Sequence, residues 1–458
     1  MFTPARYVIV DDNPGELQQL ANSLQKVGAP CLALLYDEAD GIDPQHLRGV
    51  RLLFLDLHLT TGAQSGNVAQ VAAVIISMLE AGITAAAPYV IILWTKHQEQ
   101  KDEFEAYLMA NLDSSKRPIA VLSLNKNDYL TGDDSKLTAK TGKRLTEDVA
   151  RVIEADPRLR ALLDWEREVL KAAGSTLAEI GNLVTAGDRT AARFSARLDE
   201  ILSLLASEAV GRANAAVDPY SAVNAALMPI LSDRIANQRA TPGSDAIWKA
   251  AVTRIADVPP PSIEDAARLN TMLHLASAGG EELGPGTWGA VTLLPDAELA
   301  DDSMLRRFDL PAGPMMSGTF CLTVKAERKA SRLCLLRVGA SCDYAQSRKG
   351  PIPFVLGAII PATATRRKSQ IPQAEFVTPP FILEGFDGPV QMIFNTHLQI
   401  TMVPSDFTNW PALCRLREQI LMQITTHGAR HATRPAIISF RPEEPKGDAE
   451  TETAPKAV

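Results

Sequence analysis

The sequence predicts a multidomain fold: an N-terminal doubly wound five-stranded parallel sheet, an all-α middle region and a C-terminal β-rich module with a closing helix. Apolar strands alternate with helical stretches at the start of the chain, alanine-rich helical patterns follow, and β-branched residues, prolines and turns dominate later. We place these parts at residues 1–156, 157–280 and 281–440, followed by a tail at 441–458.

Five short apolar strands are predicted between Tyr7 and Lys126, and four of them lead into polar residues. Strand 7–10 leads into Asp11 and Asp12, strand 52–55 into Asp56, strand 90–94 into Thr95, and strand 121–125 into Lys126. Ligands of open α/β sheets sit beyond the carboxyl ends of the strands. We therefore expect these polar residues to meet at one site.

These residue types suit phosphoryl transfer to a carboxylate. Carboxylates packed together bind a hard divalent cation such as Mg²⁺, which also accepts phosphoryl oxygens. An aspartate in that position can attack phosphorus, while Lys126 and Thr95 offer cationic and hydroxyl partners to the transition state. The product would be an aspartyl phosphate.

With these residues in this order, the first 130 residues or so resemble a receiver domain of the two-component response-regulator family, which has a flavodoxin-like sheet. The resemblance implies that Asp56 is the phosphoacceptor and that a partner histidine kinase is the phosphoryl donor. It implies that Thr95 and Lys126 bind the phosphoryl group and act as the switch. The implied Mg²⁺ ligands are Asp11, Asp12, Asp56 and the backbone carbonyl of His58.

Four features depart from the family's pattern. The spacings from Asp56 to Thr95 and from Thr95 to Lys126 are long. Thr60 and Asn127 stand where many receivers have proline, and Leu124 replaces the aromatic residue that usually rotates on phosphorylation. These departures leave the predicted site chemistry intact and concern the usual output switch.

Each of these residues has a simpler interpretation when taken alone. Asp11 and Asp12 precede Asn13-Pro14-Gly15-Glu16, which is typical of a helix start with a cap, a first-turn proline and a capping glutamate. The complete ordered set favours the receiver interpretation. An alternative remains in which the domain is a degenerate receiver that serves as a protein-interaction scaffold without phosphorylation.

In another alternative, the receiver gates an enzyme in the C-terminal module. The candidates for thiol or metal chemistry there are Cys342-Asp343-Tyr344, His397, His427 and His431. Their spacing matches no known site, and a buried cysteine is more often a packing residue. We identify no separate catalytic domain.

Whole-chain properties narrow the class of protein. A net charge of −8 and a pI near 5.5 argue against a chain that binds nucleic acid through overall positive charge. Five scattered cysteines fit cytosolic thiols, and the absence of a secretory signal predicts a cytoplasmic protein. The apolar stretch 68–94 is interrupted by Glu80, Gly82 and Pro88, so we expect a buried helix, a loop and a strand rather than a membrane span.

The later elements follow from periodicity. Helices are predicted at 144–155, 189–212, 218–237, 244–256, 263–274 and 410–426, with an extended loop at 127–143, strands at 318–325, 333–338, 354–360, 376–383 and 390–394, and disorder at 442–458. The strands suggest a small barrel or sandwich. The apolar stripe of helix 189–212 predicts either core packing or a partner-binding helix; it comprises Phe194, Leu198, Ile201, Leu202 and Leu205.

No helix-turn-helix with a basic recognition helix is evident, so we expect output through protein contacts rather than DNA binding. The sequence thus predicts a phosphorelay protein that accepts a phosphoryl group on Asp56 and signals to a downstream protein or a second copy of itself. Its architecture is similar to receivers of bacterial conflict systems, including the anti-phage system named Detocs. That similarity implies a phosphate buffer or regulator in antiviral defence.

Overall fold

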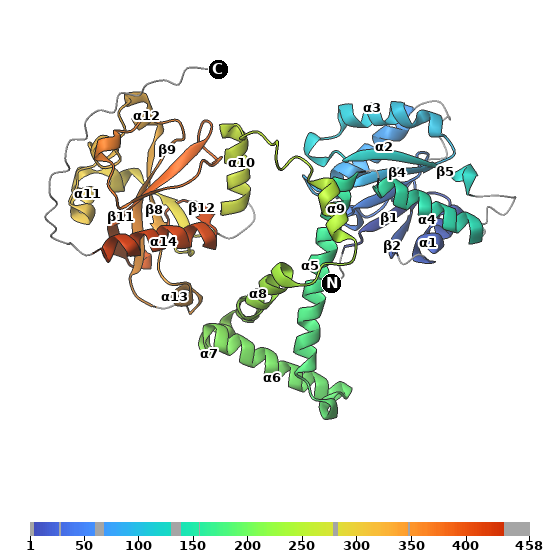
Figure 1. Cartoon of the computed structure of the whole chain (residues 1–458), viewed down its shortest axis with the longest axis horizontal. Helices are drawn as coiled ribbons and strands as arrows, with labels where there is room; N and C mark the ends of the chain where they lie inside the picture. Colours follow the sequence, from blue (N-terminus) through green and yellow to red (C-terminus); the bar gives the residue numbers. More distant parts are fainter. Residues whose placement is uncertain are drawn as a thin grey trace, which may run out of the picture. The chain divides into compact units, whose positions relative to one another are not determined.

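The structure is a computed structural model that describes residues 4–26, 29–59, 68–129, 139–154, 156–277, 283–346 and 349–434 (Figure 1). Contacts divide the chain into two compact units. One comprises Met1–Leu170 and Arg239–Ile255, and the other comprises Lys171–Gln238 and Ala256–Val458. The predicted disordered tail lies outside the described residues.

The first unit is built on a five-stranded parallel sheet. Its strands, in the order β2-β1-β3-β4-β5, are β1 (Tyr7–Asp11), β2 (Cys31–Leu35), β3 (Leu52–Leu55), β4 (Val90–Thr95) and β5 (Ala120–Asn125). Every residue of β3 and β4 is buried, as expected for parallel strands covered on both faces. The predicted parallel sheet is confirmed, and its strand order reverses between β1 and β3.

Helices cover both faces of this sheet. One face packs on α2 (Val68–Gly82) and α3 (Lys101–Asn111), and the other packs on α1 (Pro14–Lys26), α4 (Ala139–Glu154) and the start of α5 (Pro157–Asn182). Asn13 caps α1, because its Oδ1 accepts the amides of Gly15 at 2.9 Å and Glu16 at 3.2 Å. The predicted loop 127–143 is wrong at both ends: 126–128 form a 3₁₀ turn, and α4 begins at Ala139.

The middle of the chain is helical, as predicted. It comprises α5, α6 (Ala191–Val210), α7 (Arg212–Val217), α8 (Pro219–Asn237), α9 (Ser244–Ala251) and α10 (Ile263–His274). The apolar stripe of α6 packs with Ile180, Val184 and Leu227 of neighbouring helices, which confirms the core interpretation. Gly211, at φ +83°, separates α6 from α7, and α9 ends before the predicted residue 256.

The C-terminal part contains one antiparallel sheet of seven strands, in the order β10-β11-β9-β8-β7-β12-β6. The strands are β6 (Leu275–Ser277), β7 (Ala290–Leu293), β8 (Arg332–Arg337), β9 (Ile352–Pro361), β10 (Glu375–Val377), β11 (Val390–Met402) and β12 (Ala412–Leu416). One face packs on α14 (Glu418–Ala432) and the other on α11 (Asp301–Phe308). The module is therefore a helix-covered open sheet rather than the predicted barrel or sandwich; its remaining helices are α12 (Lys325–Ala330) and α13 (Ser341–Ala345).

Three predicted elements of this module are wrong. The strand at 318–325 is instead a π-helix at Met315–Thr319 that leads towards α12. The helix at 410–426 is strand β12 followed by α14, and α14 packs on the sheet as expected. The strand at 376–383 stops at Val377, because Pro379 and Pro380 cannot donate ladder hydrogen bonds.

Candidate functional site

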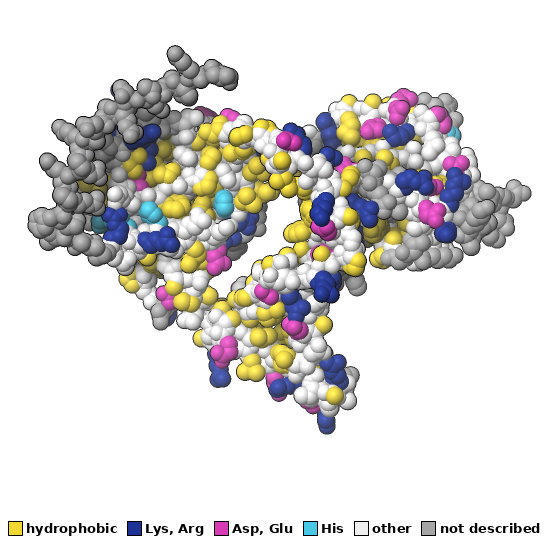
Figure 2. Space-filling view, viewed as in Figure 1, with side chains coloured by type: hydrophobic (Ala, Val, Ile, Leu, Met, Phe, Trp, Pro, Cys, Tyr) yellow, Lys and Arg dark blue, Asp and Glu magenta, His cyan; other side chains and the backbone are white. Residues whose placement is uncertain are grey.

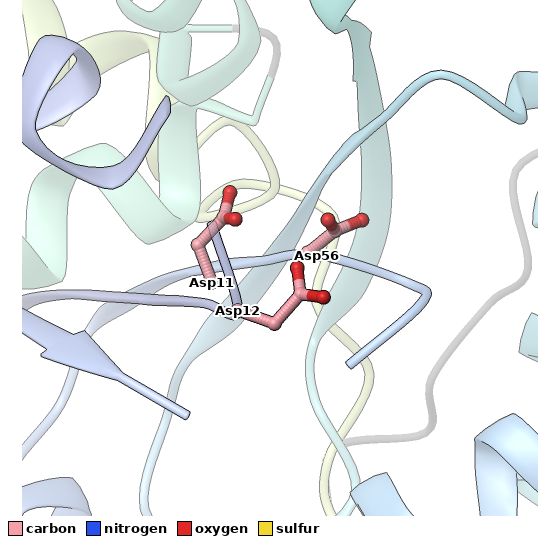
Figure 3. Close-up of side chains that lie close together, drawn as sticks. All are labelled: Asp11, Asp12 and Asp56. Carbon is pink, nitrogen blue, oxygen red and sulfur yellow. The ribbon is translucent and has the colours of Figure 1, made fainter. Parts of the chain in front are cut away.

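The predicted polar residues lie at the carboxyl edge of the parallel sheet. Asp11 ends β1, Asp56 follows β3, Thr95 ends β4 and Lys126 follows β5. Figure 3 shows the side chains of Asp11, Asp12 and Asp56 near one another where the chain leaves β1 and β3. The strand order reverses between these two strands, which is where open α/β sheets bind ligands.

Lys126 compensates the negative charge of this site. Its side chain is almost fully buried, and Nζ lies 2.8 Å from Asp11 Oδ2 and 2.6 Å from Asp56 Oδ2. A third carboxylate oxygen, Glu16 Oε2, lies 2.7 Å from the same nitrogen. One ammonium group therefore donates to three carboxylates.

The three aspartates form the one possible metal site of three or more ligands that the described residues contain. Oxygens of Asp11, Asp12 and Asp56 lie within 4.8 Å of one another. Asp11 Oδ1 accepts the amide of Asn13 at 2.8 Å, and Asp56 Oδ1 accepts the amide of His58 at 3.3 Å. Carboxylate oxygens are the ligands that Mg²⁺ prefers, so this cluster fits a hard divalent cation.

Burial and repulsion from a neighbouring carboxylate make Asp11 and Asp12 harder to ionise. Burial raises the pKa of Asp11 to about 6; Lys126 opposes the rise and Asp56 adds to it. Burial and the nearby Asp56 also raise the pKa of Asp12. The pKa of Lys126 is raised despite the desolvation of its ammonium, because Asp56 and Asp11 stabilise the charged form. Lys126 therefore stays positively charged, and a bound metal cation would further stabilise the ionised carboxylates.

Glu16 is a site residue that the sequence analysis interpreted only as a helix cap. Its Oε1 accepts from Lys96 Nζ at 2.7 Å while Oε2 faces Lys126. Burial opposes its ionisation, but the hydrogen bonds from Lys126 and Lys96 lower the pKa of Glu16 overall. The partners are distant along the chain, so no local pattern could reveal this role.

Thr95 and His58 occupy the same edge of the sheet. The buried Thr95 Oγ1 accepts the amide of His97 at 3.1 Å. The rings of His58 and His97 meet edge to face with centroids 4.6 Å apart, and His58 Nε2 lies 2.9 Å from Gln100 Oε1. The metal-ligand role of the His58 carbonyl and the phosphoryl-binding role of Thr95 stay predictions, and Thr60 lies outside the described residues.

The C-terminal candidates form no comparable site. All five cysteines are free, and Cys342 is exposed. The rings of His397 and His431 lie 5.2 Å apart, whereas His427 Nε2 lies 3.1 Å from a backbone carbonyl. Within the described ranges, these side chains belong to no group of three or more possible metal ligands.

Similarity to known proteins does not identify this chain. Searches against family models, curated proteins and solved structures find no match. None of the described helices combines the length and apolar character that a membrane crossing requires. The function must therefore be inferred from the geometry of the site.

Proposed function

We propose that the first unit is a receiver-like domain that accepts a phosphoryl group on Asp56 in a Mg²⁺-dependent reaction. The observation that carries this proposal is the 2.6 Å contact of Lys126 Nζ with Asp56 Oδ2, beside the clustered oxygens of Asp11 and Asp12. The strand order β2-β1-β3-β4-β5 supports it, because this is the flavodoxin-like order.

The side chains of the site suit such a transfer. An oxygen of Asp56 would form the new bond to phosphorus as the bond from phosphorus to a donor histidine nitrogen breaks, and the released imidazole would take up a proton. Asp11, Asp12, Asp56 and the His58 carbonyl would hold Mg²⁺, whose charge stabilises the phosphoryl oxygens. Lys126 would neutralise a further phosphoryl oxygen, and the hydroxyl of Thr95 would donate to another.

We infer that the output is contact with a protein, either a downstream partner or a second copy of this chain. Three large apolar side chains of α10 are at least half exposed: Leu269, Met272 and Leu273. Figure 2 shows hydrophobic side chains gathered where α10 lies in Figure 1. Exposed apolar patches are typical of protein-contact sites. The five free thiols fit a cytoplasmic location, and the antiviral role is proposed from architecture alone.

The test uses the full chain and a small phosphodonor such as acetyl phosphate. We expect intact mass spectrometry to show one added phosphoryl group in the presence of Mg²⁺, with loss of the group in Asp56→Asn. Asp40→Asn, which changes an exposed carboxylate in the same unit, is the matched control and should be modified like wild type. Equal modification of Asp56→Asn and wild type would exclude the assigned acceptor.

One observation favours a second candidate, the non-phosphorylated scaffold. Lys126 already has three carboxylate partners, including Glu16, so its charge is compensated without a phosphoryl group. Mg²⁺ with beryllofluoride, a phosphoryl mimic, should raise the melting temperature of a working receiver site. No rise in wild type, together with no phosphoryl transfer, would favour the scaffold.

A further inference from the structure

A cleft in the first unit lies at the amino ends of the strands, away from the acidic site. Its volume is about 460 Å³, within the range of small-molecule sites. Arg6 and Tyr7 line it from the start of β1, and Arg51 lines it from the start of β3. Helix α5, Ile247 of α9, Pro30 and Leu52 form the rest of its wall.

The lining of the cleft is rich in arginine. Four guanidinium groups line it, those of Arg6, Arg51, Arg160 and Arg167, against the two carboxylates of Asp164 and Glu166. Glu166 is shared, because its Oε1 lies 2.5 Å from Arg6 Nη2 and its Oε2 lies 3.0 Å from Arg51 Nε. Arg167 Nη2 also lies 3.5 Å from Glu168 Oε1, so the positive surplus is smaller than the lining alone gives but still favours an anion such as a phosphate monoester. One guanidinium group can also donate two parallel hydrogen bonds to two phosphate oxygens.

Two buried polar atoms of the cleft have no hydrogen-bond partner among the residues that the structure describes. Asp164 is 4% exposed, and its Oδ1 pairs with Arg167 while its Oδ2 accepts no hydrogen bond. Arg6 Nε is likewise buried without an acceptor. An unsatisfied buried group costs about 1–3 kcal/mol, so such atoms call for a missing partner. A ligand that offers both a donor and an acceptor would satisfy them.

The remaining wall is apolar. Leu163, Leu170 and Ile247 line it together with the ring of Tyr7. We propose that this cleft binds a small molecule that combines a phosphate monoester, an N–H or O–H donor and a flat apolar body, which is the chemistry of a mononucleotide. The arginines would hold the phosphate, Asp164 Oδ2 would accept from the base or sugar, and the apolar wall would cover the base.

The site joins segments that are distant in sequence. The β1 and β3 ends, the part of α5 up to Leu170 and the returning segment Arg239–Ile255 all belong to the first unit. A bound nucleotide would stabilise the packing of α5 and α9 on the sheet. This proposal does not rest on phosphorylation of Asp56.

Isothermal titration calorimetry of the full chain with the four ribonucleoside 5′-monophosphates tests the proposal. We expect at least one to bind, with inorganic phosphate and the matching nucleoside weaker by about tenfold or more. Arg51→Gln should weaken binding by about tenfold or more, whereas Arg158→Gln should not, because Arg158 is exposed on α5 and lies outside the cleft. Titration of Asp56→Asn keeps this test separate from phosphoryl transfer.

Arg51 also pairs with Glu166, so its replacement can weaken the fold as well as the site. Leu170→Trp is the second variant, since this half-exposed side chain can grow into the cleft without disturbing the core. It should abolish binding while the melting temperature without ligand stays close to that of wild type. Absence of binding by all four nucleotides, equal binding of inorganic phosphate, or full binding in both variants would overturn the proposal.

Discussion

Replacing Asp11 by asparagine should stabilise the first unit when no divalent cation is present. Burial, with Asp56 adding and Lys126 opposing, raises the pKa of Asp11 to about 6 from an ordinary 3.8. This difference of about two pH units means that ionised Asp11 costs the native state about 3 kcal/mol. The pKa already includes the attraction and hydrogen bond of Lys126, so this cost is net of that contact. Asparagine is uncharged, as protonated Asp11 is, and should therefore stabilise the unit by up to about 3 kcal/mol.

The gain should depend on pH and on metal. Because the native pKa of Asp11 is raised, its protonated form favours folding below pH 3.8, and this contribution is lost as the pH rises through about 6. The variant should therefore lose its advantage at low pH. Mg²⁺ at about a thousand times its Kd adds about 4.1 kcal/mol to a chain that binds it. Wild type should then become the more stable protein.

Native-state hydrogen exchange of the intact chain measures this effect within the unit. Amides of β1 and β3 report the free energy of opening of the sheet around the site. Asp40→Asn serves as the control, since it removes one exposed charge from the same unit. Lower protection in Asp11→Asn than in wild type at neutral pH without metal, or an equal gain in the control, would refute the electrostatic reasoning.

Two further predictions concern other buried groups. Lys126→Met leaves Asp11 and Asp56 without their cation, while Glu16 keeps Lys96, and should cost about 3–5 kcal/mol in the same exchange experiment. Lys96→Met, at a half-exposed side chain with one partner, should cost about 1 kcal/mol or less. A thiol reagent added to the native chain should modify exposed Cys342 first, and peptide mass spectrometry should find Cys334 and Cys414 modified only after denaturation; both are buried, and burial raises the pKa of Cys414 to about 12.

The parallel sheet of the first unit could be predicted from sequence because its strands are short apolar runs with distinctive endings. Asp56 and Lys126 directly follow strands that the structure confirms. The role of Glu16 in the site was not predicted, since its contact with Lys126 depends on tertiary packing and its position fits a helix cap equally well. Local patterns therefore located the carboxyl edge of the sheet but not every charge on it.

The C-terminal module shows the limit of periodicity. Leu413, Leu416, Ile420 and Ile424 follow helical spacing, yet the first two belong to strand β12. Within β12 the buried residues are Cys414 and Leu416, an alternation too short to outweigh the longer helical pattern. The three-residue strand β6 and the four-residue strand β7 were missed for the same reason.

The first unit is discontinuous in sequence, since Arg239–Ile255 belongs to it although the preceding segment Lys171–Gln238 belongs to the second unit. Helix α5 contributes Leu159 to the sheet's core and Glu166 to the arginines at its edge. A fragment cut at residue 156 would lack both. During synthesis, the sheet leaves the ribosome well before α9 does. The first unit therefore cannot complete its fold until the intervening helices and α9 have been synthesised. The order of synthesis therefore determines when this unit can finish folding.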